Sequence, residues 1–401
     1  MMQILDNEKE QRITPLFRLA FRPFFLGASI FSVIAMIIWA MFWSGQLTNV
    51  QLMYGNPVWW HAHEMLIGFT GAIIIGFLLT AVQNWTGNPG VRGPKLMVLF
   101  ALWLVARIGL LFANPHWVWM VIDLSWIPLA AFFLAQPIIV RRQWNNLFFS
   151  PLLILLTVIN ALMHLNALSI TQFDLHKLTL ALVTVISVIV LVVGGRVIPF
   201  FTWRGTNTAQ ITRPEPIEWL ALVPSWLLML NVLLPIPEAI NQITLPALFI
   251  ITGVTNLIRF ARWRSFSTAK VPLLWSLHFA YGCMVIGMLM LGAHFAGMAI
   301  SYSVGLHFIT VGGMGSMILA MMARVSLGHT GRNLQVGRIM VFAFLVMIAS
   351  VLVRTLMVQL LPALTLNGYV YSALLWALAF GVFAIVYFPI LSKPRVDGRP
   401  G

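Results

Sequence analysis

Long apolar runs follow one another along almost the whole chain, separated by short polar turns. A helix needs about 20 residues to cross the hydrocarbon core of a bilayer, and twelve runs come near that length. The predicted spans are residues 23–44, 58–82, 95–113, 116–138, 150–169, 175–200, 218–234, 239–260, 271–295, 302–325, 337–361 and 367–391. The pattern therefore predicts an all-α fold, a polytopic membrane helix bundle of about 12 transmembrane helices.

The segments outside these spans are too short to form a soluble domain. We expect residues 1–401 to form a single integral membrane domain, with a polar cytoplasmic segment at 1–17 and a short basic cytoplasmic tail at 392–401. Residues 1–17 are mixed in charge, so no cleavable signal peptide is predicted. The two spans between residues 218 and 260 are the least regular, because prolines interrupt or border them: Pro224, Pro235, Pro237 and Pro246.

Composition excludes several classes of protein. Only 8% of the residues are charged and 60% are hydrophobic, whereas soluble domains carry about 25% charged residues. The net charge of +14 does not indicate nucleic-acid binding, because the basic residues stand singly or in small groups between apolar runs rather than on one face of a soluble fold. The lone Cys283 excludes a disulfide framework, a cysteine zinc site and an iron–sulfur cluster within this chain.

The distribution of Lys and Arg predicts the orientation. If both termini lie on one side, all but four of the 24 basic residues fall on that side. The exceptions are Lys177 on the other side and Arg107, Arg196 and Arg354 within spans. Cytoplasmic loops carry the excess of positive charge, so we expect both termini to be cytoplasmic in a multi-pass protein of the cytoplasmic membrane, in contact with lipid.

With this orientation, most histidines fall in the outer third of the membrane domain. They are His61, His63, His116, His164, His176, His294 and His307, whereas His278 lies deeper and His329 lies in a cytoplasmic loop. Histidine in a span is costly, and it usually binds a metal, transfers a proton or forms a hydrogen bond. For His116 and His294, at the ends of loops, we expect hydrogen bonds to nearby backbone rather than metal ligation.

The segment Trp59–Met65 is the most informative. On a regular helix, His61 and Glu64 share a face, while His63 projects roughly 200° away from His61. The two histidines then serve different partners, unless His61 precedes the first helical turn. Glu64 either orients a ligating His61 through its second nitrogen or simply favours the start of a helix through the helix dipole.

Two other spans show regular spacing of small or sulfur-containing residues. Gly68, Ala72, Gly76 and Thr80 form a small-residue stripe, for which contact with another helix is the expected use. In the span that contains His307, Met314 and Met321 follow at seven-residue intervals. A face with histidine and methionine suits haem iron or copper, although methionine also fills gaps in apolar cores.

Three arginines within spans require partners. Arg107 and Arg354 lie in outer halves, where they would either clamp the propionates of a haem or pair with Glu64, Asp123 or carbonyls at helix ends. Arg196 lies at the inner end of its span. It would either contact the cofactor or extend its charge to the cytoplasmic interface.

Several motifs together resemble those of the NnrS family of bacterial membrane proteins. They are Trp60–His61–Ala62–His63–Glu64–Met65, Asn84–Trp85–Thr86–Gly87, Gly194–Gly195–Arg196–Val197–Ile198–Pro199, Leu277–His278 and the run from His307 to Gly331, together with Phe21–Arg22–Pro23–Phe24–Phe25 near the start. They occur in order and cover nearly the whole chain. The resemblance implies a twelve-helix protein of the bacterial inner membrane that contains haem b and copper and is linked to denitrification and nitric oxide tolerance.

The family's recurring histidines match His61, His63, His278, His307 and His329, but the resemblance assigns no ligands. From depth and facing, we predict His61, His63, His278 and His307 as metal and haem ligands, with Arg107, Arg196 and Arg354 toward the cofactor. Glu64, His164, His329, Met314 and Met321 are supporting candidates. His278 should lie about 15–20 Å deeper than His61. It would therefore contact a haem that stands upright and spans part of this distance, bind a second haem, or have a structural role in the core. We expect His329 to shape its loop.

Three functions compete. The first is a haem protein whose partner is nitric oxide or another small gas, with turnover by a haem–copper oxidoreductase reaction as one option. The second is a transporter of a small solute without redox chemistry, favoured by the prolines near residues 218–260. The third delivers copper or haem to a denitrification enzyme. The sequence does not identify the electron donor, the number of haems or the oligomeric state.

Overall fold

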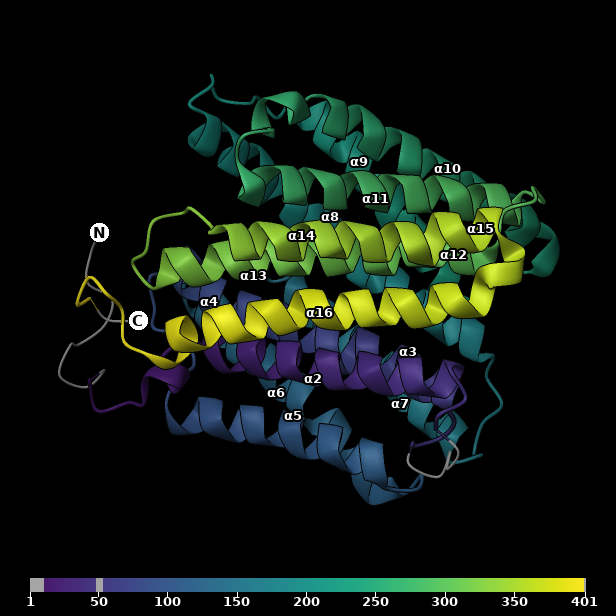
Figure 1. Cartoon of the computed structure of the whole chain (residues 1–401), viewed down its shortest axis with the longest axis horizontal. Coiled ribbons are helices and arrows are strands. Elements are labelled where there is room, and N and C mark those ends of the chain that lie inside the picture. Colours follow the sequence, from purple (N-terminus) through teal and green to yellow (C-terminus); the bar gives the residue numbers. More distant parts are fainter. Residues whose placement is uncertain (1–10, 48–52, 400–401) are drawn as a thin grey trace. The chain divides into compact units, whose positions relative to one another are not determined.

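The computed structural model describes residues 11–47 and 53–399, and within these ranges every regular element is a helix (Figure 1). In this described part of the chain, twelve helical segments are long and apolar enough to cross a membrane. The prediction of a multi-pass helical membrane protein is confirmed. The side on which each end lies stays a prediction, and the part of the expected polar segment before residue 11 falls outside the described residues.

The helices form two compact units. Unit 1 consists of residues 1–179, 322–334 and 380–401, and unit 2 of residues 180–321 and 335–379. Both units contain membrane-spanning helices. The expectation that the chain forms a single membrane domain stays a prediction.

Unit 1 is built mainly from the first five spans. They are α2 (Phe21–Trp43), the continuous span α3 (Pro57–His63), η3 (Glu64–Gly71) and α4 (Ala72–Thr86), then α5 (Pro94–Phe112), α6 (Trp117–Val140) and α7 (Phe149–Ala167). The small-residue stripe of the second span packs against α2, as expected. At Gly76 an added Cβ would lie 2.9 Å from Phe24 Cβ, and the Thr80 hydroxyl accepts a hydrogen bond from the Phe21 backbone N–H at 3.0 Å.

Unit 2 contains most of the later helices. They are α8 (Leu175–Thr206) from residue 180 onward, α9 (Glu215–Leu233), α10 (Glu238–Ala261), α11 (Pro272–Phe295), α12 (Tyr302–His307), η6 (Phe308–Gly315), α13 (Ser316–His329) to residue 321, α14 (Arg338–Leu352), η7 (Val353–Met357), α15 (Val358–Leu360) and α16 (Thr365–Ser392) to residue 379. Figure 1 shows α9, α10 and α11 close together, and α10 contacts both α9 and α11 directly. Pro224 and Pro246 lie inside α9 and α10 without ending them.

Short 3₁₀ turns connect several spans: Trp144–Asn146, Ser265–Thr268 and Pro362–Leu364. Another, Pro15–Phe17, precedes the first span. Some predicted boundaries were too short. The span predicted to end at residue 200 continues to Thr206. The helix α13 reaches His329, so the expectation that His329 lies in a loop was wrong. This helix ends where Gly331 adopts a left-handed conformation with φ of 74°, which glycine takes at little cost.

Within the described residues three segments are π-helical, and each lies at a candidate residue. The π-helical segment η3 begins directly after His63, η6 begins directly after His307, and η7 contains Arg354. The Thr70 hydroxyl donates to the Met65 carbonyl, five residues back, at 2.8 Å in η3. π-Helical turns are rare and occur often at functional sites, so these segments direct attention to His63, His307 and Arg354.

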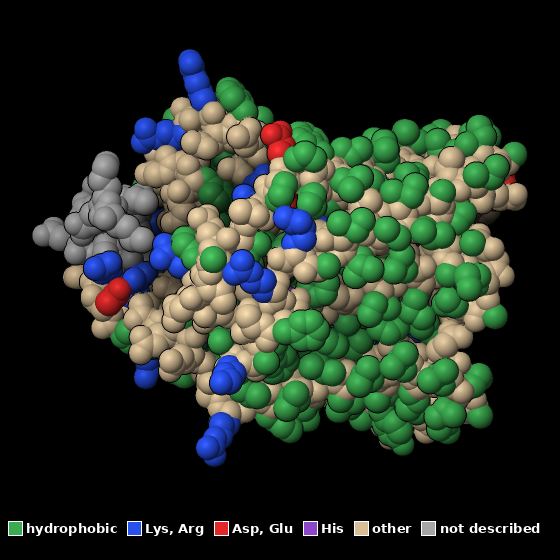
Figure 2. Space-filling view, turned by 90° about the horizontal axis from the view of Figure 1, so that it is seen from above, with side chains coloured by type: hydrophobic (Ala, Val, Ile, Leu, Met, Phe, Trp, Pro, Cys, Tyr) green, Lys and Arg blue, Asp and Glu red, His purple; other side chains and the backbone are tan. Residues whose placement is uncertain are grey.

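The surface agrees with a membrane environment. Figure 2 shows one face of the molecule, on which hydrophobic side chains cover the lengths of the helices. Most of the Lys and Arg side chains visible there lie toward one end of the helices. Large apolar side chains such as Val98, Ile108 and Phe132 are exposed, as expected of residues that contact lipid rather than water.

Candidate metal centre

The two histidines of the second span lie in α3, which begins with a capped first turn. Asn56 caps the helix by accepting a hydrogen bond from the Trp59 N–H at 2.9 Å, and Pro57 occupies the first helical position. His61 is half-buried and its ring stacks on Trp39 of α2, with centroids 4.0 Å apart. His63 is fully buried and stacks on Trp59, with centroids 4.6 Å apart. The two histidines therefore face different neighbours, as their helical spacing predicts.

His63 lies at the centre of a buried polar cluster. Its Nδ1 lies 3.0 Å from Glu64 Oε1, and its Nε2 lies 2.8 Å from Asn160 Oδ1 and 3.1 Å from Asp123 Oδ2. Glu64 thus contacts His63, whereas the sequence pattern paired it with His61. The side chain of Glu64 turns toward the adjacent imidazole and Arg107 rather than along the helix face that it shares with His61.

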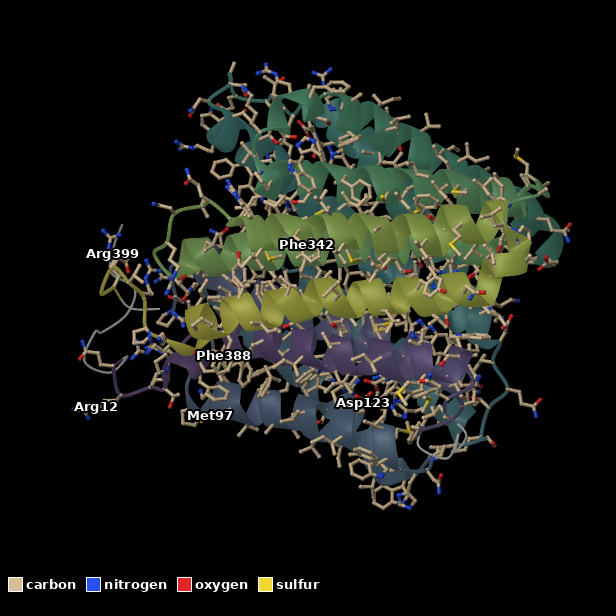
Figure 3. The ribbon with its side chains drawn as sticks, viewed as in Figure 1. Arg12, Met97, Asp123, Phe342, Phe388 and Arg399 are labelled. Carbon is tan, nitrogen blue, oxygen red and sulfur yellow. The ribbon has the colours of Figure 1, made fainter. Side chains whose placement is uncertain are left out.

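His164 of α7 approaches the same carboxylate from the opposite side of the cluster. Its Nε2 lies 3.1 Å from Asp123 Oδ2, and its Nδ1 lies 3.1 Å from the Tyr54 hydroxyl. Asn160, one helical turn before His164, donates to the same Asp123 oxygen at 2.7 Å. Figure 3 labels Asp123 among the side chains packed between the helices of unit 1, where its side chain is fully buried.

The ligand atoms of His63, Asp123 and His164 all lie within 4.8 Å of one another, a spacing that a single metal ion can bridge. Both imidazoles direct Nε2 inward and hold Nδ1 against another polar group. This arrangement is typical of metal-binding histidines, because the outer partner fixes the tautomer and raises the basicity of the ligand nitrogen. Two imidazoles and one carboxylate suit copper(II), zinc(II) or iron(II).

Arg107 balances half of the negative charge of the two carboxylates in the cluster. Its Nη1 donates to Glu64 Oε2 at 2.7 Å, and its Nη2 pairs with Asp123 Oδ1. Of the two alternatives for Arg107, pairing with carboxylates is therefore the one observed. With neutral imidazoles, two carboxylates and one guanidinium leave one net negative charge in a fully buried site. Such a charge is unfavourable in a low-dielectric interior, and a bound cation would neutralise it.

Tyr54, in the loop before α3, closes the cluster on one side. Its side chain is fully buried, and its backbone N–H donates to the Leu110 carbonyl at 3.1 Å. Burial raises the pKa of Tyr54 to about 12, because the phenolate would lose its hydration. The phenol therefore keeps its proton at physiological pH and offers His164 Nδ1 a neutral hydroxyl.

In unit 2, His307 and Arg354 contact each other. His307 Nδ1 lies 2.6 Å from the Ser303 carbonyl, so this nitrogen carries the proton, and Nε2 accepts a hydrogen bond from Arg354 Nη2 at 3.1 Å. The π-helical turn η6 between His307 and Met314 breaks the seven-residue spacing on which a shared histidine–methionine face depends. Met314 and Met321 are both buried.

His278 of α11 is held by two hydroxyl groups. Its Nε2 lies 2.8 Å from Thr202 Oγ1, and its Nδ1 lies 2.9 Å from Ser265 Oγ. Both nitrogens are thus engaged in hydrogen bonds, as in a histidine that stabilises helix packing. Of the options left open for His278, the geometry favours a role in the core.

Arg196 is exposed and lines a polar cavity of about 330 Å³ in unit 2. The cavity is also lined by Arg213, Glu215 and Glu218. Arg259, which was not a candidate from sequence, is buried there and pairs with Glu218. Since Arg196 reaches the surface rather than the interior, its position fits the alternative in which its charge lies at the membrane interface.

The remaining histidines form local contacts. His116 Nδ1 caps α6 by accepting from the Val118 N–H at 3.3 Å, and His294 Nδ1 donates to the Ile300 carbonyl at 2.8 Å, which agrees with the roles expected for them. The His329 ring packs against Phe21, and its carbonyl accepts from Arg395 at 2.8 Å.

Sequence reasoning missed Asp123 and Asn160 as members of the cluster. Asp123 was considered only as a partner for arginine, and His164 only as a supporting candidate. One signal was present: Asn160 and His164 are spaced by four residues in an otherwise apolar run, so they share a helix face. Their joint contact with Asp123 depends on the packing of α6 against α7, which the sequence of a single span does not encode.

Comparison with known families supports the resemblance found in the sequence. The family model described as NnrS protein matches residues 15–395, which is nearly the whole chain. No curated protein matches the chain.

Proposed function

Because the chain belongs to the NnrS family, we propose that it is a haem- and copper-containing protein of the bacterial inner membrane that binds nitric oxide and acts in nitric oxide tolerance and denitrification. The observation that carries the proposal is the buried cluster of His63, Asp123 and His164, whose ligand atoms converge within 4.8 Å. We assign the copper to this cluster.

The chemistry of the cluster suits a redox metal. Imidazole nitrogens are good ligands for copper and iron, and the carboxylate of Asp123 favours the oxidised divalent state. Electron exchange with nitric oxide requires a metal with two accessible oxidation states, which zinc does not offer. Nitric oxide is small and uncharged, so it reaches a site between helices through the apolar bilayer without a polar channel.

Haem requires a different ligand. The ring of His63 is covered by Trp59, and its Nε2 already faces Asp123 and Asn160, so this residue suits a single ion better than a porphyrin. His307 is the better candidate for haem iron, because the Ser303 carbonyl holds the proton on Nδ1 and so makes Nε2 the nitrogen with a lone pair. In the structure Nε2 accepts a hydrogen bond from Arg354, which haem iron would replace. Haem b held there would supply a reduced iron that binds nitric oxide.

Burial distinguishes this function from delivery of a metal to another protein. His63, Asp123 and His164 are all 0% exposed. A cargo ion must enter and leave, which favours ligands at a surface. A site enclosed on every side by protein favours an ion that stays in place.

Absorption spectroscopy tests the proposal. Purified protein is recorded oxidised, then reduced with dithionite, before and after addition of nitric oxide. We expect a Soret band whose reduced form shifts with nitric oxide, and loss of that band in His307→Ala but not in His278→Ala, which also removes a buried histidine of unit 2. Well-folded protein from haem-replete cells without a Soret band would contradict the haem assignment.

A further inference from the structure

Arg354 differs from Arg107 and Arg259 in its surroundings. Its side chain is only 8% exposed. Arg107 pairs with Glu64 and Asp123, and Arg259 pairs with Glu218. Among the described residues, Arg354 has no carboxylate partner.

The groups that do contact Arg354 are uncharged. Its Nη2 donates to Ser303 Oγ at 2.9 Å and to His307 Nε2 at 3.1 Å. The Tyr369 side chain also forms a hydrogen bond with the guanidinium, whose carbon lies 4.2 Å from the centre of the Tyr369 ring. Its Nη1 is buried with no hydrogen-bond partner in the described part of the chain. A buried donor without an acceptor is unfavourable, and more so when it carries charge.

The acidic residues of unit 2 are engaged elsewhere. Glu218 pairs with Arg259, while Glu215 accepts from Trp219 and Glu238 accepts from Gln242. The positive charge of Arg354 is therefore not neutralised within its own unit. A buried cation is retained at such a position when a second charge compensates it.

We propose that Arg354, together with Ser303 and His307, binds a small, planar, singly charged oxyanion of the carboxylate type. A guanidinium presents parallel N–H donors that match the two oxygens of a carboxylate or nitrite. Ser303 adds a hydroxyl that can donate to the same anion. His307 accepts from Arg354 and so adds no positive charge, which matches one cation to one negative charge and disfavours phosphate or sulfate.

The local backbone and packing fit this site. Arg354 lies in the π-helical segment η7, and His307 directly precedes the π-helical segment η6. Val304 and Phe308, which flank His307, are buried in an apolar cluster with Val351 and Val358. A carboxylate attached to an apolar body and a free anion such as nitrite would both fit this setting. The site shares His307 with the proposed haem site, but it requires neither a metal at His63 nor nitric oxide, so it goes beyond the function proposed above.

Thermal unfolding of the purified full-length protein measures binding of a free anion. Sodium nitrite and sodium formate are titrated against sodium chloride at equal ionic strength. A ligand that binds only the folded state raises the unfolding temperature with a saturable dependence on concentration. We expect this rise in the wild type and in Arg204→Gln, which removes an exposed arginine of unit 2, and at least a tenfold weaker apparent affinity in Arg354→Gln.

A second readout identifies a haem propionate as the source of the carboxylate. In that case neither free anion raises the unfolding temperature, but Arg354→Gln transfers haem to apomyoglobin at least tenfold faster than Arg204→Gln. If Arg354→Gln does not fold, Arg354→Lys, which keeps the charge but loses the paired donors, replaces it in both measurements. Equal behaviour of the Arg354 and Arg204 variants in both measurements would overturn the proposal. Metal content at His63 stays unchanged in every variant, which separates failure here from failure of the proposed function.

Discussion

Removal of Arg107 tests whether the polar cluster of unit 1 is held together by charge. Arg107→Leu keeps an apolar side chain within α5 but leaves Glu64 and Asp123 without their shared cation. Both carboxylates are fully buried, and the arginine side chain is 2% exposed. The substitution therefore leaves two buried charges uncompensated.

The expected magnitude follows from these contacts. Breaking a single buried ion pair by removing one partner costs about 3–5 kcal/mol. Arg107 serves two carboxylates, so we expect a loss in the free energy of unfolding near the upper end, about 5 kcal/mol. Since about 1.4 kcal/mol corresponds to a factor of ten, the unfolding equilibrium should shift by more than three orders of magnitude.

The assay is reversible unfolding in mixed micelles, followed by tryptophan fluorescence on protein treated with a chelator, so that metal binding does not contribute. Arg204→Leu is the matched control. Arg204 is exposed and its guanidinium lies over the Trp203 ring at 4.7 Å, a contact worth about 0.5–1 kcal/mol. Combining Arg107→Leu with Glu64→Gln removes one stranded charge and should recover at least about 1 kcal/mol.

Two results would refute this reasoning. One is a loss in Arg107→Leu no larger than in Arg204→Leu. The other is a double variant with Glu64→Gln that is no more stable than Arg107→Leu alone. Either would show that the two carboxylates do not depend on the guanidinium for their stability in the folded protein.

Three further predictions concern the same unit. Glu64→Gln should weaken metal affinity by about 10- to 100-fold, because Glu64 orients His63; unchanged affinity in competition with a chromogenic chelator would contradict this role. Gly68→Ala should lower the free energy of unfolding by about 1–3 kcal/mol, because the added Cβ would overlap Arg107 Nη1 and Glu64 Oε2, and an equally stable variant would show that the pair can move aside. Hydrogen bonds from Arg395 hold the pKa of Asp397 well below its usual range, so the stability difference between wild type and Asp397→Asn should be constant from pH 7 to 5 and decline only as the pH falls below the ordinary carboxyl value of 3.8; a decline that is complete at pH 5 would contradict it.

The spans could be predicted from the sequence because hydrocarbon thickness fixes their length. All twelve predicted spans correspond to helices of the structure. Their ends were less predictable, because a helix that leaves the hydrocarbon continues until local chemistry stops it. The helix α13 continues to His329 and ends only where Gly331 adopts a left-handed conformation.

The different directions of His61 and His63 could also be predicted from the sequence, since each residue of a helix is rotated by a fixed angle about the helix axis. The π-helical segments could not be predicted from the sequence, because their i to i+5 hydrogen-bond pattern produces no simple period of hydrophobic residues. Their effect is largest at His307 and Met314, which a regular helix would place on one face.

The metal centre itself needed tertiary information. His63, Asp123 and His164 come from α3, α6 and α7, so no spacing along the chain links them. The sequence showed buried charges that need partners, and Arg107 did find Glu64 and Asp123. It did not show which histidines meet those carboxylates, because that depends on how the helices rotate and pack.

Metal content of purified variants tests the central claim most directly. The copper, iron and zinc contents of the wild type, His63→Gln, His164→Gln and His278→Gln are measured by mass spectrometry. Haem iron is quantified from the absorption spectrum and subtracted from the total iron. We predict about one non-haem copper ion per chain in the wild type and in His278→Gln, and less than a tenth of that in folded His63→Gln and His164→Gln. Folded His63→Gln and His164→Gln proteins with the wild-type metal content would contradict the account.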